Sequence, residues 1–200
     1  MIQRAIWLSL FFAVLLWSAW KPHDYPTWAL EVTPALIALI VLVLTRRSFP
    51  LTTLAYVLIL VHALILMLGG HYTYAEVPVG DWLRDVTGGS RNNYDKLGHF
   101  AQGFVPAIIT REILLRNRVL QRGAWLSIIV VSICLAISAL YELVEWWVAL
   151  LSEDAAESFL GTQGYIWDTQ SDMFFALAGA CCGILLLARW HDRQLAALQR

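Results

Sequence analysis

The chain contains 200 residues, of which 59% are hydrophobic and 14% are charged, and its formal net charge is −1 at pH 7. Ordinary soluble domains contain about 45–50% apolar residues, so the composition excludes that class. A net charge near zero gives no support for nucleic-acid binding, which depends on a basic surface. The composition therefore indicates an integral membrane protein.

Six apolar runs are each long enough to cross a bilayer, because a hydrocarbon core of about 30 Å requires about 20 apolar residues in a helix. The first run is the shortest, and the fourth is the least apolar because it carries His99 and Gln102. We predict an all-α polytopic membrane protein in which residues 1–200 form one integral membrane domain. The six predicted transmembrane helices cover about residues 5–20, 28–45, 51–69, 97–115, 124–151 and 166–190.

The basic residues orient these helices. If the N-terminus is cytoplasmic, ten of the 14 lysines and arginines lie at cytoplasmic positions and four lie on the opposite side. Short cytoplasmic connections are enriched in Lys and Arg, so we predict that both termini are cytoplasmic. Arg111 and Glu112 are then interpreted as an interfacial pair at an inner helix end. His23 and His191 lie outside the apolar runs and are predicted to be solvated.

Two long connections lie on the outer side. The first covers residues 70–94 and is rich in aromatic and apolar residues, which favours a packed lid over disorder. Within it, residues 81–86 are predicted to form a short interfacial helix that ends at Gly88 and Gly89. The second connection covers residues 152–167, and its acidic first half is predicted to be a solvated surface.

The last three predicted helices carry polar side chains near their outer ends, at spacings that place them on one helix face. Ionisable groups in membrane spans usually face the protein interior and mark a functional site. We therefore predict one pocket that opens to the extracytoplasmic side. Its residues are Asp95, His99 and Gln102 in the fourth helix, Glu142 and Glu145 in the fifth, and Asp168 and Asp172 in the sixth.

Several carboxylates cannot share a pocket unless some are protonated or cations neutralise them. Lys96 and Arg91 could neutralise two of them, and a bound divalent metal ion could neutralise more. Carboxylate ligands favour Mg²⁺, Ca²⁺ or Mn²⁺, and an added imidazole makes Zn²⁺ or Fe possible. The predicted metal ligands are Asp95, His99, Glu142, Asp168 and Asp172.

One hypothesis is a metal-dependent enzyme that acts on a lipid or cell-envelope intermediate, with membrane lipids and a lipid-linked or envelope small molecule as its partners. The metal ion would polarise a phosphoryl or carbonyl oxygen and activate a water. Glu145 or His71 would act as general base or acid, and Lys96 or Arg91 would hold an anionic headgroup.

Three alternatives without turnover stay open. The same residues could bind a cationic solute, proton or metal ion in transport, although acids and histidines are scarce in the cytoplasmic half. They could belong to an envelope scaffold that binds a headgroup or a partner. They could also form a structural hydrogen-bond network that fixes helix packing.

Four segments of the chain resemble the YjdF family of bacterial inner-membrane proteins, and the resemblance extends over nearly the whole chain. It implies a multi-pass location in the bacterial inner membrane. It implies no activity, because that family is of unknown function. The segments are GHYTY at 70–74, NYDKLGHF at 93–100, YELVEW at 141–146 and GTQGYIWDTQSDM at 161–173.

The last three helices are also similar, more distantly, to the VanZ-like family. That family has the pattern D-K-x-x-H-F, then E-x-x-Q, then D with N four residues later and G seven residues later. Glu145 replaces the Gln of this pattern and Ala176 replaces the Asn, which makes the site more acidic and favours a cation. The resemblance implies a link to glycopeptide resistance and the cell envelope, without a settled chemistry. The matching residues are Asp95, Lys96, His99, Phe100, Glu142, Asp172 and Gly179.

Overall fold

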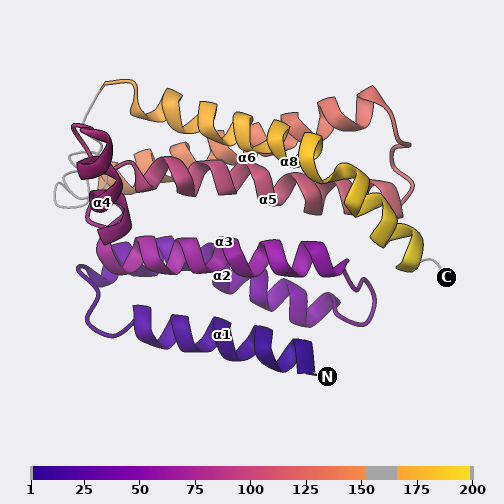
Figure 1. Cartoon of the computed structure of the whole chain (residues 1–200), viewed down its shortest axis with the longest axis horizontal. Helices are drawn as coiled ribbons and strands as arrows, with labels where there is room; N and C mark the ends of the chain where they lie inside the picture. Colours follow the sequence, from indigo (N-terminus) through magenta and orange to yellow (C-terminus); the bar gives the residue numbers. More distant parts are fainter. Residues whose placement is uncertain (1, 152–165, 199–200) are drawn as a thin grey trace. The chain divides into compact units, whose positions relative to one another are not determined.

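The computed structural model describes residues 2–151 and 166–198, and every regular element in these ranges is a helix. The predicted all-α class is therefore confirmed. The acidic half of the second outer connection lies outside the described residues. The elements are α1 (Ile2–Ser18), α2 (Tyr25–Thr45), α3 (Thr53–Tyr72), α4 (Pro78–Thr87), α5 (Tyr94–Arg116), α6 (Ala124–Leu151) and α8 (Asp168–Leu198) (Figure 1).

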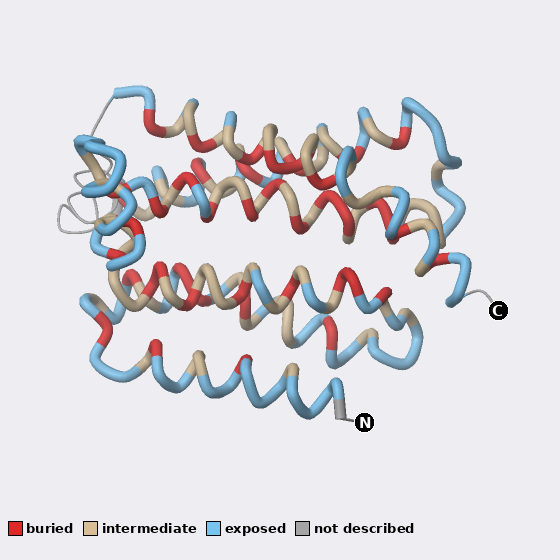
Figure 2. Tube along the Cα trace, in the orientation of Figure 1, coloured by how far each residue is buried: buried red, intermediate tan, exposed pale blue. Residues whose placement is uncertain are grey.

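Four of the described helices, α2, α3, α6 and α8, are long and apolar enough to cross a membrane. Helix α1 is apolar but shorter, and α5 carries Asp95, Arg111 and Glu112 among its apolar residues. Many large apolar side chains point outward, and Figure 2 shows that exposed positions dominate α1. Leu185 and Leu186 of α8 are 81% and 70% exposed. Such surfaces suit a lipid environment, in which the helix backbone satisfies its own hydrogen bonds.

The chain divides into two compact units. The first comprises Met1–Leu51 and Tyr56–Gly98, and the second comprises Thr52–Ala55 and His99–Arg200. Two of the three boundaries fall inside helices, because α3 and α5 each contribute residues to both units.

The first unit has an apolar core shared by α1, α2 and α3. Two tryptophans fix the register of these helices by donating from their indole nitrogens. Trp7 Nε1 donates to the Tyr56 carbonyl at 2.8 Å, and Trp28 Nε1 donates to Ser18 Oγ at 3.1 Å. The buried core residues are Phe11, Val32, Ala35, Ala63 and Met67.

The predicted short helix in the first outer connection is confirmed as α4, although it begins earlier, at Pro78. Proline is favoured in the first turn of a helix because its fixed φ suits that position and its missing N–H is not needed there. The helix ends at Gly88, whose φ of +68° is left-handed. The backbone N–H groups of Gly88 and Gly89 both donate to the Arg84 carbonyl, a common way to satisfy the last carbonyls of a helix.

In the second unit, α5 and α8 approach so closely that their backbones are in contact. A Cβ atom added at Gly103 would overlap the Ala176 carbonyl, and one added at Gly179 would overlap the Phe100 carbonyl. Small residues at helix interfaces are the usual means of close packing in membranes. These glycines set the distance between the two helices that carry His99 and Asp172.

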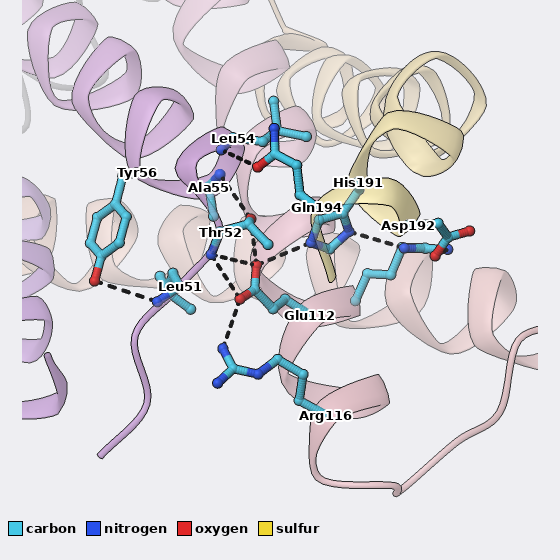
Figure 3. Close-up of polar contacts among 11 residues, drawn as sticks. Leu51, Thr52, Leu54, Ala55, Tyr56, Glu112, Arg116, His191, Asp192 and Gln194 are labelled. Carbon is cyan, nitrogen blue, oxygen red and sulfur yellow. Dashed lines mark hydrogen bonds and ion pairs between the residues drawn. The ribbon is translucent and has the colours of Figure 1, made fainter. Parts of the chain in front are cut away.

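A buried polar cluster joins the start of α3 to the C-terminal parts of α5 and α8 within the second unit. Its central group is the Glu112 carboxylate, which accepts hydrogen bonds from Thr52 Oγ1 at 2.7 Å, Arg116 at 2.9 Å and His191 Nε2 at 3.0 Å (Figure 3). The backbone N–H of Thr52 also donates to this carboxylate at 3.0 Å. We call Thr52, Arg111, Glu112, Arg116, His191 and Asp192 the Glu112 cluster.

The Glu112 cluster corrects one prediction made from the sequence. His191 is not solvated, since it is 0% exposed, and Arg111 and Glu112 are also buried, at 5% and 0% exposed. Helix α8 continues to Leu198 instead of ending near residue 190, so His191 lies within a packed helix. The charges tolerate burial because each has an oppositely charged or hydrogen-bonded neighbour.

The hydrogen bonds of the cluster also fix the proton on His191. Arg111 Nη1 lies 3.0 Å from His191 Nδ1, and its Nη2 donates to Asp192 at 2.8 Å. A guanidinium can only donate, so Nδ1 must accept. The imidazole is therefore neutral, with its proton on Nε2, the atom that faces Glu112.

We expect Gly179→Ala to lower stability, because the added methyl group meets the backbone of α5 and the helices must separate. Overpacking of this kind costs about 1–3 kcal/mol. The matched control is Gly89→Ala, where the added Cβ would meet only ordinary contacts. Thermal unfolding of both variants in detergent is the measurement. Equal stability of the two variants would contradict the backbone contact.

Glu112→Ala is expected to destabilise the protein by about 3–5 kcal/mol, the usual cost of leaving a buried charge without its partner. Arg116 and His191 would both lose their acceptor. The control is Glu76→Ala, which removes an acid whose side chain is 61% exposed and should change stability by less than about 0.5 kcal/mol. Chemical denaturation in micelles measures both, and a similar small loss in the two variants would disprove the structural role of the cluster.

Candidate functional site

Three ionisable side chains from three helices meet in the second unit. They are His99 of α5, Glu142 of α6 and Asp172 of α8, and we call them the His99 triad. His99 Nδ1 lies 3.9 Å from Glu142 Oε1, and His99 Nε2 lies 3.8 Å from Asp172 Oδ1. Both carboxylates are buried, and each residue offers one ligand atom within 4.8 Å of the others.

The local sequence explains how these side chains converge. Gly179 lies two helical turns after Asp172 and brings α8 against the Phe100 carbonyl, the residue next to His99. Asp172 also lies near the N-terminus of α8, where the helix dipole favours a negative charge. Glu142 comes from α6, which packs beside α8.

The imidazole of His99 has a defined neighbour at one ring nitrogen. The Gln102 side-chain oxygen lies 3.2 Å from Nδ1, so Nδ1 carries a proton and donates to it. Nε2 then faces Asp172 across 3.8 Å, which is longer than a hydrogen bond of 2.7–3.2 Å. Three states satisfy this geometry: an imidazolium between two carboxylates, a neutral imidazole with a cation beside Nε2, or a neutral imidazole beside a protonated Asp172.

The second state matches a common feature of metal sites. A histidine that binds a metal through one nitrogen usually donates its other N–H to an oxygen acceptor, which fixes the ring. Gln102 supplies such an acceptor for His99. One imidazole and two carboxylates are ligands that suit Mn²⁺, Zn²⁺ or Fe, and carboxylates alone suit Mg²⁺ and Ca²⁺. The donor set of the His99 triad therefore fits a divalent cation.

The structure brings together three of the five predicted metal ligands as the His99 triad. A fourth, Asp168, is 3% exposed and lies one turn before Asp172 at the start of α8. Glu145, predicted as a general base, is half-buried and follows Glu142 by three residues on α6. These residues all belong to the second unit.

The remaining predicted site residues lie in the first unit. Asp95, the fifth predicted ligand, accepts a hydrogen bond from Arg91 at 2.8 Å, and Lys96 Nζ lies 3.4 Å from the same carboxylate. The expected neutralisation of an acid by Arg91 and Lys96 is thus present at Asp95. The buried Lys96 and the half-buried Arg91 both pair with the Asp95 carboxylate and neutralise its charge.

His71 was predicted to reach the site from a lid, but α3 continues to Tyr72 and places His71 in its last helical turn. Its Nδ1 lies 3.0 Å from the Ser18 carbonyl and therefore donates to it. Its ring centroid lies 4.5 Å from that of Trp17, and its own carbonyl accepts from the backbone N–H of His23 at 3.0 Å. These contacts give His71 a structural role in closing the connection between α1 and α2.

Two residues near the triad were not assigned a role from the sequence. Gln102 was placed on the His99 face but was not predicted to hold the imidazole. Ser138 lies one helical turn before Glu142 and is completely buried, and within the described ranges its hydroxyl has no hydrogen-bond partner. A buried polar group of this kind requires an explanation. The sequence could have pointed to Ser138 only through its position four residues before Glu142, which places both side chains on one face of the helix.

Comparison with known proteins gives the chain a family. A family model described as a predicted membrane protein, DUF2238, matches residues 3–193. The chain is 53% identical over 182 residues, which are 91% of this chain and 87% of the relative, to the inner membrane protein YjdF of Escherichia coli strain K12. No solved structure matches the chain.

These findings confirm the resemblance to the YjdF family, whereas the VanZ-like resemblance stays a prediction. Together with the four apolar helices that can span a membrane, they establish a multi-pass inner-membrane protein. The chain belongs to the DUF2238 family of predicted membrane proteins.

Proposed function

We propose that six helices cross the inner membrane as one integral domain, with both termini in the cytoplasm. Helices α1 and α5 are the two further spans, in addition to α2, α3, α6 and α8. With 17 and 23 residues, they extend about 26 Å and 35 Å at 1.5 Å per residue. The ten-to-four distribution of basic residues supports this orientation. The His99 triad then lies toward the extracytoplasmic side and the Glu112 cluster toward the cytoplasm.

A reporter fused after Arg200 tests this orientation. Green fluorescent protein should fluoresce there, and alkaline phosphatase should be inactive, because the first folds in the cytoplasm and the second requires the periplasm. The same pair inserted between Gly88 and Gly89 should give the opposite result. Phosphatase activity at the C-terminus would reverse the proposed topology.

We further propose that the His99 triad binds a divalent cation. The observation that carries this proposal is the imidazole held by Gln102 with its other nitrogen directed at Asp172. A cation would compensate two buried carboxylates, whose ionised forms are otherwise costly. Three protein ligands leave coordination positions open, which is typical of catalytic rather than structural sites.

The function that this site supports best is metal-assisted chemistry on a lipid or a lipid-linked envelope intermediate. A bound cation would polarise a phosphoryl or carbonyl oxygen and lower the pKa of a bound water. Glu145 is the proposed general base, because it lies on α6 close to Glu142 and is half-buried. A lipid substrate is favoured because the helices that carry the triad present apolar outer surfaces.

The other proposed roles concern residues of the first unit. Lys96, with Arg91, is proposed to hold an anionic headgroup, since both carry a positive charge next to Asp95. His71 is a weaker candidate for acid–base chemistry, because its Nδ1 is used in the bond to Ser18.

A second candidate function is transport or binding without turnover, with His99 protonated between its two carboxylates. The Glu112 cluster supports this candidate, although the sequence alone argued against it. The scarcity of ionisable groups in the cytoplasmic half argued against a through-pathway, yet Glu112 and His191 are buried there on the proposed topology. Transporters place binding groups where both sides of the membrane can be reached.

Metal analysis and titration test the proposed site. We expect purified protein to bind about one equivalent of Mn²⁺ or Zn²⁺ per chain, as expected for a single three-ligand site. His99→Ala and Asp172→Asn should abolish this binding, because each removes a ligand. Gln102→Ala should weaken it by about 10–100-fold, the usual effect of losing the acceptor that orients a metal-bound histidine. The control is Glu76→Gln, which alters an exposed acid.

Thermal unfolding with and without chelator separates a cation site from a structural network. A cation at 100 times its Kd should stabilise the wild-type protein by about 2.7 kcal/mol, and Asp172→Ala should lose this increment. Asp172→Ala should also be at least as stable as the wild type without metal, because one acid leaves a crowded site. A large loss in Asp172→Ala and in Glu142→Ala, independent of chelator, would support the structural network instead.

A further inference from the structure

Helix α4 carries a stripe of large apolar side chains that point away from the rest of the first unit. The residues are Val79, Trp82, Leu83 and Val86, which are 51%, 63%, 51% and 65% exposed. Their spacing is i, i+3, i+4 and i+7, so they form one continuous face of the helix. We call these four residues the α4 stripe.

The opposite face of α4 is small and polar, and it is the face that contacts the chain. Gly80 is buried against Asn92, since an added Cβ atom would overlap that side chain. Asn92 Nδ2 donates to the Val77 carbonyl at 2.9 Å and to Asp81 Oδ1 at 3.2 Å. Arg84 pairs with the same Asp81 oxygen at 2.8 Å. Asn92 therefore anchors the helix through Gly80 and Asp81.

This arrangement reverses the usual pattern of a surface helix. In a soluble protein, the apolar face packs on the core and the charged face meets water. Here Asp81 is held inward by Asn92, and Trp82 and Val86 point outward. Rotating the helix by half a turn would bury the apolar residues but would lose the contacts of Asn92. The hydrogen bonds of Asn92 therefore fix the orientation in which the α4 stripe faces outward.

The position of α4 in the chain places it at a membrane surface. Helix α3, a candidate span, ends at Tyr72, and α4 begins at Pro78. Its ten residues extend about 15 Å, too short for a hydrocarbon core of about 30 Å. A short helix with one apolar face lies in the plane of the interface, where tryptophan is also favoured.

We propose that α4 is an interfacial helix whose α4 stripe inserts into the lipid at the boundary between headgroups and acyl chains. The expected depth is about 5–10 Å, as for other amphipathic helices at membranes. The polar face then remains toward the protein, and the exposed Asp85 lies at the edge of the helix nearest to water. The proposal does not depend on the function of the His99 triad. On the proposed topology, the helix lies in the outer leaflet.

Single labelled cysteines on α4 test the contact with lipid. Cys181 and Cys182 are replaced by Ala, and the buried Cys134 is kept and checked for background labelling. Trp82→Cys and Val86→Cys sample the α4 stripe, and Asp85→Cys is the matched control on the same helix. Each variant is labelled with the environment-sensitive fluorophore NBD. The labelled proteins are reconstituted in vesicles of phosphatidylethanolamine and phosphatidylglycerol, after size-exclusion chromatography confirms that they are folded.

The expected result is a difference between the two faces. Labels at positions 82 and 86 should emit at shorter wavelength, lose most of their intensity when lipids carry a nitroxide near the top of the acyl chain, and resist aqueous iodide. The label at position 85 should be quenched by iodide and little affected by nitroxide lipids.

Two outcomes would overturn the proposal. If iodide quenches positions 82 and 86 as strongly as position 85, the α4 stripe faces water. If neither quencher reaches positions 82 and 86, protein covers the stripe. In the second case, disulfide crosslinking of unlabelled Trp82→Cys between chains would identify a second copy as the cover, and its absence would indicate another segment of this chain.

Discussion

The direct contact between the backbones of α5 and α8 is the constraint on which the rest of the second unit depends. Gly103 and Gly179 permit it, because any larger side chain would meet a carbonyl of the other helix. The two helices run parallel, since His99 pairs with Asp172 near their starts and Glu112 pairs with His191 near their ends. One pair of helices thus supplies two members of the His99 triad and every member of the Glu112 cluster except Thr52. A change in the separation of these helices would alter both clusters at once.

The two clusters meet the cost of buried charge in different ways. In the Glu112 cluster, hydrogen bonds of 2.7 to 3.0 Å join Glu112 to Thr52, Arg116 and His191. In the His99 triad, the imidazole lies 3.8 and 3.9 Å from its two carboxylates. The first arrangement is closed and stabilises packing. In the second, the contacts of His99 are longer than hydrogen bonds, and this difference supports the proposal that the triad binds a cation.

The sequence predicted the positions of the helices more reliably than the residues at which they end. Residues 124–151 were predicted as a helix and form α6, because a continuous apolar run has one good solution in a membrane. The ends of α3 and α8 were less predictable, since hydropathy falls where the polar residues begin. His71 and His191 were therefore assigned to a loop and a tail, although both lie in helices.

Spacing along one helix also predicted which side chains share a face, and His99, Glu142 and Asp172 meet as those spacings suggested. The pairing of His191 with Glu112, 79 residues earlier, was not predicted, because His191 was placed outside the sixth predicted helix. The outward direction of the α4 stripe was equally hidden. It depends on Asn92, a loop residue whose side chain binds the backbone of a segment 15 residues away.

The fixed proton on His191 has an electrical consequence. Among the members of the Glu112 cluster, Arg111 and Arg116 contribute two positive charges, Glu112 and Asp192 two negative charges, and a neutral His191 none, so these five side chains sum to zero. The exposed Arg122, which donates to Asp192 at 2.9 Å, adds one positive charge at the edge of the cluster. A membrane potential acts on net charge, at about 2.3 kcal/mol per elementary charge per 100 mV. On the proposed topology, a membrane potential would therefore exert no net force on these five side chains, even though four of them are ionised.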